Sequence, residues 1–140
     1  MSVVDSMFIE GGLLSEVLNE WEPRQQQVDM SVAVADALES RGQLLVEAGT
    51  GVGKSFGYLV PAIRRIIEHD EIVVVATNTI TLQEQIVHHD VPILHEAFGG
   101  GFDPVLVKGR ANYISIRRME RALAQRTLLL SNPMAVTELN

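Results

Sequence analysis

Hydrophobic residues recur every three or four positions in several stretches of the chain, which is the spacing of one face of a helix. This pattern predicts helices over residues 25–40, 54–68, about 82–98 and 112–130. Pro61 falls inside the second helix. Because proline lacks an amide hydrogen, we expect it to bend or shorten that helix.

Three shorter apolar runs, at residues 44–47, 72–76 and 104–107, lie between the predicted helices. The second is a continuous β-branched run without alternation, which is typical of a strand covered on both faces. Strands that alternate with helices predict βαβ units, and therefore an α/β fold with a parallel sheet and helices on both faces. Residues 1–20 are expected to be a weakly structured extension, and residues 21–140 part of one domain that stops short of a full sheet.

Between the first predicted strand and the second helix lies a glycine-rich loop that matches the Walker A or phosphate-binding pattern. Its residues are Ala48, Gly49, Thr50, Gly51, Val52, Gly53, Lys54 and Ser55. Glycines let successive amides approach an anion, and the helix that follows adds its own unsatisfied amides. In this pattern Lys54 reaches the β- and γ-phosphates, and the Ser55 hydroxyl holds Mg²⁺. The alternative is a glycine-rich turn followed by a chance Lys-Ser pair.

Charge is distributed unevenly along the chain. The net charge is −7, which argues against general affinity for nucleic acid. Residues 108–126 nevertheless carry six basic side chains and one acidic one, a local charge of +5. The sequence has no cysteine, which excludes disulfides and cysteine-ligated metals within these residues. No apolar run approaches the ~20 residues of a membrane span, and the N-terminus lacks a signal pattern, so we expect a cytoplasmic protein.

The order of four motifs resembles the DinG/XPD branch of the superfamily 2 helicases, over residues 11–126. The motifs begin at Trp21-Glu22-Pro23-Arg24-Gln25-Gln26-Gln27 and continue with the phosphate loop, Thr77-Asn78-Thr79-Ile80-Thr81-Leu82-Gln83-Glu84-Gln85 and Lys108-Gly109-Arg110-Ala111-Asn112-Tyr113. The resemblance implies the start of a RecA-like P-loop NTPase motor domain. It also implies ATP and Mg²⁺ as ligands, single-stranded DNA as a partner, and a role in DNA repair.

The resemblance assigns Arg24 and Gln27 to the Q motif, in which a glutamine amide reads the adenine edge. An amide can donate and accept at once, which suits adenine. Gln26 is the second candidate for this role. Trp21 has two interpretations, stacking on the base or packing in the core.

The resemblance assigns the segment after residue 76 to motif Ia, which lies along the DNA backbone. Its candidate DNA contacts are Thr77, Asn78, Thr79 and Gln83. Hydroxyls and amides contact phosphates without sequence preference. Capping of a helix by Thr77, Asn78 or Thr79 is the alternative, and both roles can hold together.

The basic segment resembles the entry to the family's iron–sulfur insertion, with Lys108, Arg110, Asn112 and Tyr113 as candidate DNA contacts. The family pattern places a cysteine two residues after the tyrosine, where this chain has Ser115. A hydroxyl is a poor iron ligand compared with a thiolate, so no iron–sulfur cluster is expected. A basic helix that is only a solvated surface is the alternative to DNA binding.

After Ser55 the sequence shows no apolar strand that ends in an acidic pair. Phosphoryl transfer needs such an acid, a second acid to activate water, and an arginine at the γ-phosphate. We therefore expect the chain by itself to bind ATP with Lys54 and Ser55 but to hydrolyse it negligibly, as part of a larger helicase. The rival hypotheses are a small P-loop kinase and a non-enzymatic module that binds nucleotide or nucleic acid.

Overall fold

The computed structural model describes residues 5–18 and 21–125. These residues divide into two compact units, one ending at Pro104 and the other beginning at Val105. The last part of the helix predicted over 112–130, residues 126–130, lies outside the described residues. Within the described part, no helix is both long and apolar enough to cross a membrane.

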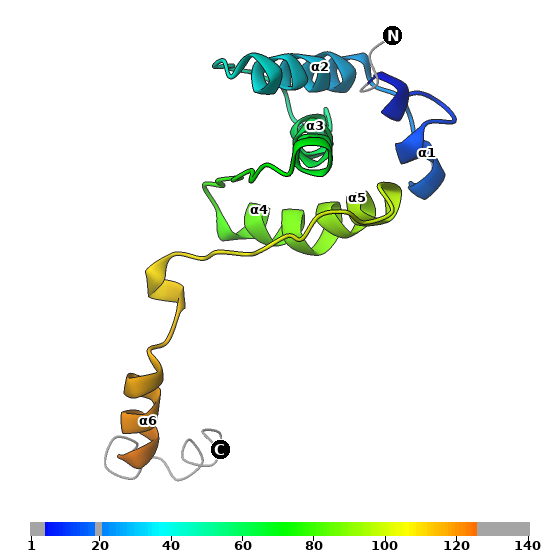
Figure 1. Cartoon of the computed structure of the whole chain (residues 1–140). Helices are drawn as coiled ribbons and strands as arrows, with labels where there is room; N and C mark the ends of the chain where they lie inside the picture. Colours follow the sequence, from blue (N-terminus) through cyan, green and yellow to red (C-terminus); the bar gives the residue numbers. More distant parts are fainter. Residues whose placement is uncertain (1–4, 19–20, 126–140) are drawn as a thin grey trace. The chain divides into compact units, whose positions relative to one another are not determined.

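The first unit is built from helices joined by extended segments (Figure 1). In chain order they are η1 (Asp5–Met7), α1 (Leu13–Val17), α2 (Gln25–Ser40), α3 (Lys54–His69), α4 (Ile80–Gln85), η2 (Ile86–Asp90) and α5 (Val91–Ala97). The predicted helices over 25–40 and 54–68 are confirmed, the second with one further residue. The predicted helix after residue 82 is also confirmed, and it begins at Ile80.

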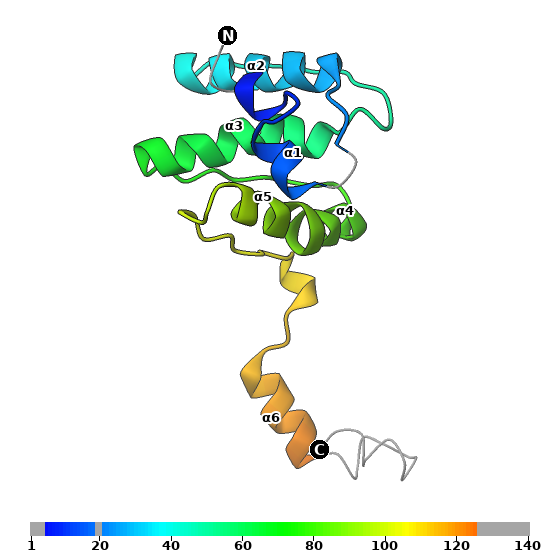
Figure 2. The ribbon, with the colours of Figure 1, turned by 90° about the vertical axis from the view of Figure 1, so that its right-hand side faces the viewer.

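Helix α3 lies between α2 on one side and the continuous α4–η2–α5 segment on the other (Figures 1 and 2). Its residues Leu59, Val60 and Ile63 are buried, and Val60 is fully inaccessible to solvent. The core that results comprises Phe8, Leu14, Leu59, Val60, Ile63, Ile86, Val91, Leu94 and Phe102. Two of these, Phe8 and Leu14, come from the segment expected to be weakly structured.

The expectation that Pro61 shortens α3 is wrong, because the helix runs unbroken from Lys54 to His69. A bend at Pro61 stays a prediction. A proline inside a helix costs about 3 kcal/mol. Its neighbours Leu59, Val60 and Ile63 are all buried. Burial of each such side chain stabilises the fold by about 1.5–3 kcal/mol, so together they outweigh the lost hydrogen bond.

Close contact between α2 and α3 depends on Gly57. A Cβ at that position would lie 3.1 Å from the Met30 sulfur, and Gly57 is buried. Farther along α3, the Arg65 guanidinium pairs with two carboxylates. Its Nη1 lies 2.6 Å from Glu39 of α2, and its Nε lies 2.9 Å from Glu71, which follows the end of α3. These hydrogen bonds raise the pKa of Arg65 and lower the pKa of Glu71, with the Arg65–Glu71 bond as the largest cause in each case.

A π-helical turn, η2, connects α4 to α5. Pro92 follows it at the start of α5 and cannot donate a backbone hydrogen bond. A π turn is a common way to accommodate such a defect within a helix, and it often marks a functional site. This turn brings Asp90 into the interior, where it is only 2% exposed.

The parallel sheet is not confirmed, because residues 5–18 and 21–125 contain no strand. The three runs predicted as strands are non-helical in the structure. Their side chains face solvent: Leu45 is 98% exposed, Ile72 95% and Val105 81%. A strand requires a hydrogen-bonded neighbour, and none of the described segments supplies one to these runs.

The second unit contains η3 (Arg110–Asn112) and α6 (Ile116–Ala124). The Tyr113 hydroxyl accepts a hydrogen bond from the Lys108 amide at 2.8 Å, which closes the turn between them. The helix predicted over 112–130 is therefore shorter at its start than expected. Tyr113 has extended backbone geometry, and Ser115 precedes the first turn of α6.

Candidate nucleotide-binding site

The glycine-rich loop ends where α3 begins, as its sequence predicts. Gly51 and Gly53 have φ values of +80° and +78°, in the left-handed region that favours glycine. Gly53 is the N-cap of α3, and no described side chain caps the helix there. The amides of the first turn, with the positive end of the helix dipole, therefore remain available to an anion.

Lys54 folds back over this loop. Its Nζ donates to the carbonyl of Gly49 at 2.6 Å and to that of Ala48 at 3.2 Å. The ammonium group thus lies at the mouth of the loop, and Lys54 remains exposed. Its partners are neutral carbonyl oxygens, and a phosphate oxygen would be a stronger acceptor for the same donor.

Two residues at the start of α2 also bind the loop. The Arg24 guanidinium donates to the Gly51 carbonyl, and Gln27 Nε2 donates to the Gly53 carbonyl at 2.7 Å. Gln27 is only 2% exposed, and its Oε1 has no hydrogen-bond partner among the described atoms. The structure therefore brings together the two residues assigned to the Q motif and the phosphate loop. Recognition of adenine by Gln27 stays a prediction.

Ser55 lies in the first turn of α3, three residues before Tyr58. The pKa of Tyr58 is raised from 10.0, first because the phenol is half-buried. The nearby negative charge of Asp90 raises it further. Sequence reasoning missed Tyr58 and Asp90, and the only available signal was the position of Tyr58 one helical turn after Ser55.

The donor set of the loop fits a magnesium nucleotide. At Gly49 and Gly51 a Cβ would meet no described atom within 4 Å, so the space beside these two residues is open. Amides and an ammonium group suit phosphate oxygens, and a serine hydroxyl is the usual protein ligand for Mg²⁺ in this pattern. Within the described residues no cluster of His, Asp and Glu could hold a metal by itself.

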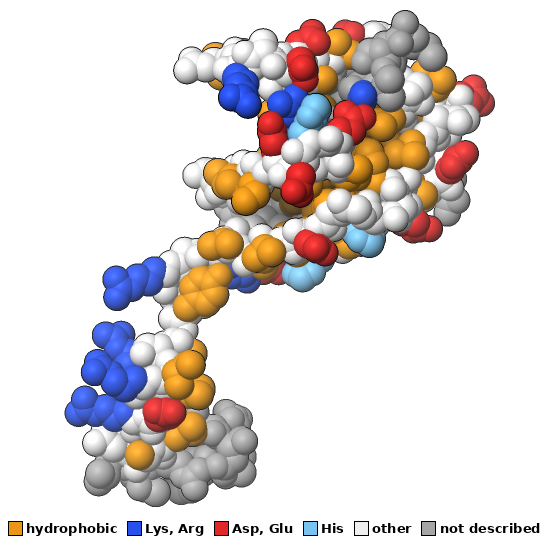
Figure 3. Space-filling view, in the orientation of Figure 1, with side chains coloured by type: hydrophobic (Ala, Val, Ile, Leu, Met, Phe, Trp, Pro, Cys, Tyr) orange, Lys and Arg blue, Asp and Glu red, His pale blue; other side chains and the backbone are white. Residues whose placement is uncertain are grey.

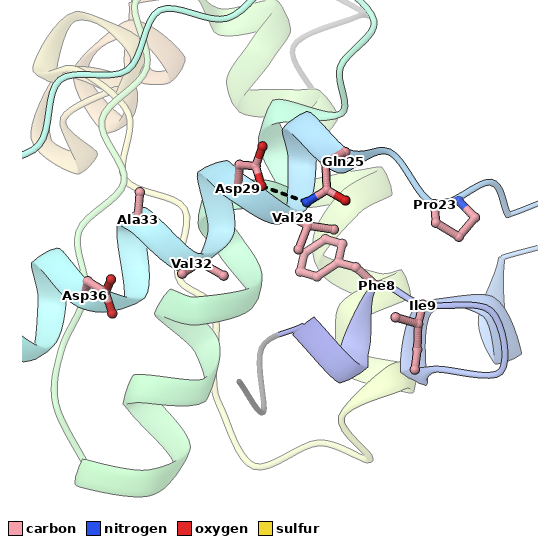
Figure 4. Close-up of a pocket in the computed structure, with 9 residues that line it drawn as sticks. All are labelled: Phe8, Ile9, Pro23, Gln25, Val28, Asp29, Val32, Ala33 and Asp36. Atoms are coloured by element: carbon pink, nitrogen blue, oxygen red, sulfur yellow. Dashed lines mark hydrogen bonds between the residues drawn. The ribbon is translucent and has the colours of Figure 1, made fainter. Parts of the chain in front are cut away.

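Trp21 is partly buried and packs against the core cluster, which favours the packing interpretation over stacking on a base. The centroids of the Trp21 and Phe8 rings lie 6.2 Å apart, and Trp21 Nε1 donates to the Phe8 carbonyl at 3.3 Å. Phe8 also lines a groove of about 660 Å³ along α2 (Figure 4). The groove residues on α2 include Gln25, Val28 and Asp29, whereas Gln27 contacts the phosphate loop. The groove therefore lies away from the phosphate loop.

The motif Ia candidates lie at the N-terminus of α4. The Thr79 hydroxyl accepts a hydrogen bond from the Leu82 amide at 3.2 Å, so Thr79 caps this helix. Thr77 donates to the Thr79 carbonyl at 3.2 Å, and Asn78 is exposed. The capping interpretation is confirmed for Thr79. Contact of Thr77, Asn78, Thr79 and Gln83 with DNA stays a prediction.

The basic candidates lie in the second unit. Arg110 and Asn112 belong to η3, where Asn112 Nδ2 donates to the Gly109 carbonyl at 3.3 Å. In Figure 3 the basic side chains of this unit gather on one side of α6 and the hydrophobic ones on the other. Tyr113 is 56% exposed. Contacts of this surface with DNA stay predictions.

Comparison with known protein families matches residues 26–135 to the family described as DEAD/DEAH box helicase. That match spans well over half of the chain. The chain belongs to the DEAD/DEAH box helicase family. Membership in this helicase family implies a RecA-like P-loop fold. The resemblance to DinG-like superfamily 2 helicases, seen in the four motifs, is therefore confirmed.

Three relatives illustrate the similarity. The chain is 34% identical over 125 residues to the ATP-dependent DNA helicase YoaA of Haemophilus influenzae, covering 89% of this chain and 19% of the relative. It is 42% identical over 104 residues to the ATP-dependent helicase DinG of Mycobacterium tuberculosis, covering 71% and 16%. It is 34% identical over 110 residues to the 3′-5′ exonuclease DinG of Bacillus subtilis, covering 79% and 12%.

The chain thus spans less than a fifth of the length of each of these relatives. No solved structure matches it. The matched region contains the Q motif residue Gln27, the phosphate loop, motif Ia and the basic segment, because all four lie between residues 26 and 135.

Proposed function

We propose that the chain is the ATP-binding part of the first motor domain of a DinG-like ATP-dependent DNA helicase. The observation that carries this proposal is the loop at the start of α3. Two glycines there have left-handed geometry, the helix amides are uncapped, and the Lys54 ammonium group lies at the mouth of the loop. This arrangement suits the triphosphate of a nucleotide.

In this proposal Lys54 exchanges its carbonyl partners for the β- and γ-phosphates, and the amides of residues 51–55 point at the phosphate oxygens. Ser55 would hold Mg²⁺, which supplies the charge that neutralises the phosphates when it is bound. Arg24 and Gln27 hold the loop from the α2 side through the carbonyls of Gly51 and Gly53. For Gln27 to read adenine, its amide would have to leave that carbonyl.

The proposal includes contact with single-stranded DNA at two places. In the first unit, Thr77, Asn78, Thr79 and Gln83 would contact backbone phosphates at the N-terminus of α4. In the second unit, Lys108, Arg110 and Asn112 would contact phosphates, and Tyr113 would stack on a base. The surplus of basic residues in this segment supports the second site.

A parallel sheet built from residues 44–47, 72–76 and 104–107 belongs to the same proposal. Each run is rich in apolar side chains, and each follows or precedes a helix in the order of a βαβ fold. Their apolar side chains are exposed in this structure, and pairing with neighbouring strands in a sheet would bury them.

A competition experiment tests the nucleotide proposal. A fluorescent ATP analogue is titrated with the chain in Mg²⁺, and then displaced with ATP, ADP or AMP. We expect ATP and ADP to displace it and AMP to fail, because the loop recognises the β-phosphate. Equal displacement by AMP, or no binding at all, would contradict the proposal. Phosphate release measured in the same samples should stay at background.

A further inference from the structure

Two side chains at the start of α2 each bind one left-handed glycine of the phosphate loop. Arg24 donates to the carbonyl of Gly51, and Gln27 Nε2 donates to the carbonyl of Gly53 at 2.7 Å. These two glycines have φ values of +80° and +78°, whereas Gly49 does not have a positive φ. The loop glycines with left-handed geometry are therefore the ones whose carbonyls α2 holds.

The direction of a loop carbonyl determines the direction of the next amide. Because the peptide unit is planar and trans, its carbonyl and its N–H point in opposite directions. A bond to the Gly51 carbonyl therefore restrains the Val52 amide, and a bond to the Gly53 carbonyl restrains the Lys54 amide. A loop of this kind binds an anion when successive amides point inward together. The two bonds from α2 thus act on the groups that would donate to phosphate.

The Gln27 amide is confined to this arrangement. The Gly53 carbonyl has two lone pairs, of which one accepts from the Gly57 amide at 3.2 Å and the other from Gln27. The amide nitrogen occupies the space that a Cβ at residue 53 would need, so the bond requires a glycine there. The helices also meet closely at this point, since a Cβ at Gly57 would lie 3.6 Å from the Gln27 carbonyl oxygen.

The same arrangement leaves Gln27 without a free group for a base. A glutamine amide that reads adenine uses its oxygen and its nitrogen together. Here the nitrogen is bonded to Gly53, and the oxygen is buried without a hydrogen-bond partner among the described atoms. With the whole residue only 2% exposed, neither group is accessible to a ligand.

We propose that Gln27 and Arg24 are positioning residues that hold the phosphate loop in its anion-binding shape, and that their contribution to affinity is independent of the base. Gln27 acts through the peptide between Gly53 and Lys54, and Arg24 acts through the peptide that follows Gly51. This role differs from the adenine reading that the helicase resemblance implies for Gln27. The inference rests on the proposed function, because it requires a ligand with phosphates at the loop.

Displacement by ligands with and without a base tests the inference. A fluorescent ATP analogue bound to the 140-residue chain in Mg²⁺ is displaced by ATP, by GTP or by inorganic tripolyphosphate, which has no base. Gln27→Met keeps the length of the side chain and removes the donor. We expect it to weaken binding of all three ligands by the same factor, about 3- to 10-fold, which is the range of one hydrogen bond. The ratio of ATP to GTP affinity should change by less than about 2-fold, as for independent sites.

The matched control is Gln25→Met, because Gln25 lies in the same turn of α2 and its amide is bonded to Asp29 at 2.8 Å. It should bind all three ligands as wild type does. Arg24→Met repeats the test at Gly51 and should also weaken the three ligands equally. Arg24 is exposed, so this variant decides the matter if Gln27→Met fails to fold.

Hydrogen exchange of the nucleotide-free chain separates positioning of the loop from a general loss of packing. In Gln27→Met we expect faster exchange over residues 49–55, because the loop has lost a restraint. Exchange over residues 58–69 should match that of wild type.

The outcomes separate the two proposals. A loss confined to ATP in Gln27→Met would identify Gln27 as a reader of adenine and overturn the inference, while phosphate binding stays intact. Unchanged affinities, or faster exchange throughout α3, would overturn it as well. Failure of the wild-type chain to bind any of the three ligands would overturn the proposed function and the inference together.

Discussion

Gln27 and Gly53 are joined by a hydrogen bond between the α2 side-chain amide and the loop carbonyl, 2.7 Å apart. The Gln27 amide nitrogen also occupies the space that a Cβ at residue 53 would need. The buried amide therefore fixes the position of the last loop residue before Lys54. Helix α2 thus sets the geometry of the phosphate loop.

This relationship predicts the effect of Gly53→Ala. The left-handed backbone costs a non-glycine residue about 1–2 kcal/mol, and the new methyl group must also displace the Gln27 amide. We expect the free energy of unfolding to fall by about 1–3 kcal/mol, measured by urea denaturation. Gly49→Ala is the matched control, since Gly49 lacks a left-handed φ and a Cβ there would meet no described atom. Equal losses from both variants would contradict this account of Gly53.

The ion pair between Arg65 and Glu71 predicts a pH dependence of stability. The pKa of Glu71 is lowered below its ordinary value of 4.5, chiefly by the Arg65 hydrogen bond. A lowered folded-state pKa contributes stability above the unfolded value and loses it as the pH falls through the folded one. The free energy of unfolding should therefore drop below pH 4.5, and less steeply in Glu71→Gln.

Arg65→Met provides the partner test of the same ion pair. Without the guanidinium, the pKa of Glu71 should return toward its ordinary value, so the acid-dependent loss should shrink in this variant as well. A profile below pH 4.5 that is unchanged in both variants would show that the pair does not contribute.

The exposed apolar runs predict unequal effects from two identical substitutions. Ile72 is 95% exposed and Ile63 is 3% exposed. Ile63→Ala should lower the free energy of unfolding by about 2–5 kcal/mol. Ile72→Ala should change it by less than about 0.5 kcal/mol if residues 72–76 stay exposed as in this structure, and by an amount comparable to Ile63→Ala if they pair in the parallel sheet proposed above. A comparable loss from Ile72→Ala would indicate that residues 72–76 are paired in a sheet.

The basic segment predicts weak, salt-dependent binding to single strands. Removal of one side chain that binds a phosphate should reduce the slope of log affinity against log salt by about 0.7. Lys108→Ala combined with Arg110→Ala should therefore weaken binding at low salt and flatten the slope, measured by anisotropy of a labelled oligonucleotide. Arg64→Ala is the control, because its guanidinium is paired with Glu68 on α3. Unchanged binding by the double variant would identify the segment as a solvated surface.

The helices and the phosphate loop could be predicted from the sequence because both depend on local information. Periodic apolar residues define α2 and α3, and glycines at 51 and 53 define a loop that needs left-handed geometry. The burial of Phe8 and Leu14 could not be predicted, since their partners lie far along the chain. The strands depend on the same kind of distant partner, which is why apolar content alone does not place them.

The parts of the site that the sequence does not predict are also long-range. The motif pattern includes Arg24 and Gln27, but their bonds to the loop carbonyls arise from the packing of α2 on α3. Tyr58 and Asp90 are separated by a loop and a helix, and only the π turn brings the carboxylate inside.

The role of Lys54 in phosphate binding is the central claim, and a titration of fluorescent ATP with Lys54→Ala tests it most directly. The Lys54 ammonium group now lies 2.6 Å from the Gly49 carbonyl and would move to the phosphates when ATP binds. We expect Lys54→Ala to lower the affinity at least about 10-fold, since a hydrogen bond to a charged group contributes about 1.5–3 kcal/mol. His88→Ala, on the π turn, should leave the affinity unchanged. Equal affinity of Lys54→Ala and wild type would contradict the assignment of this loop to nucleotide binding.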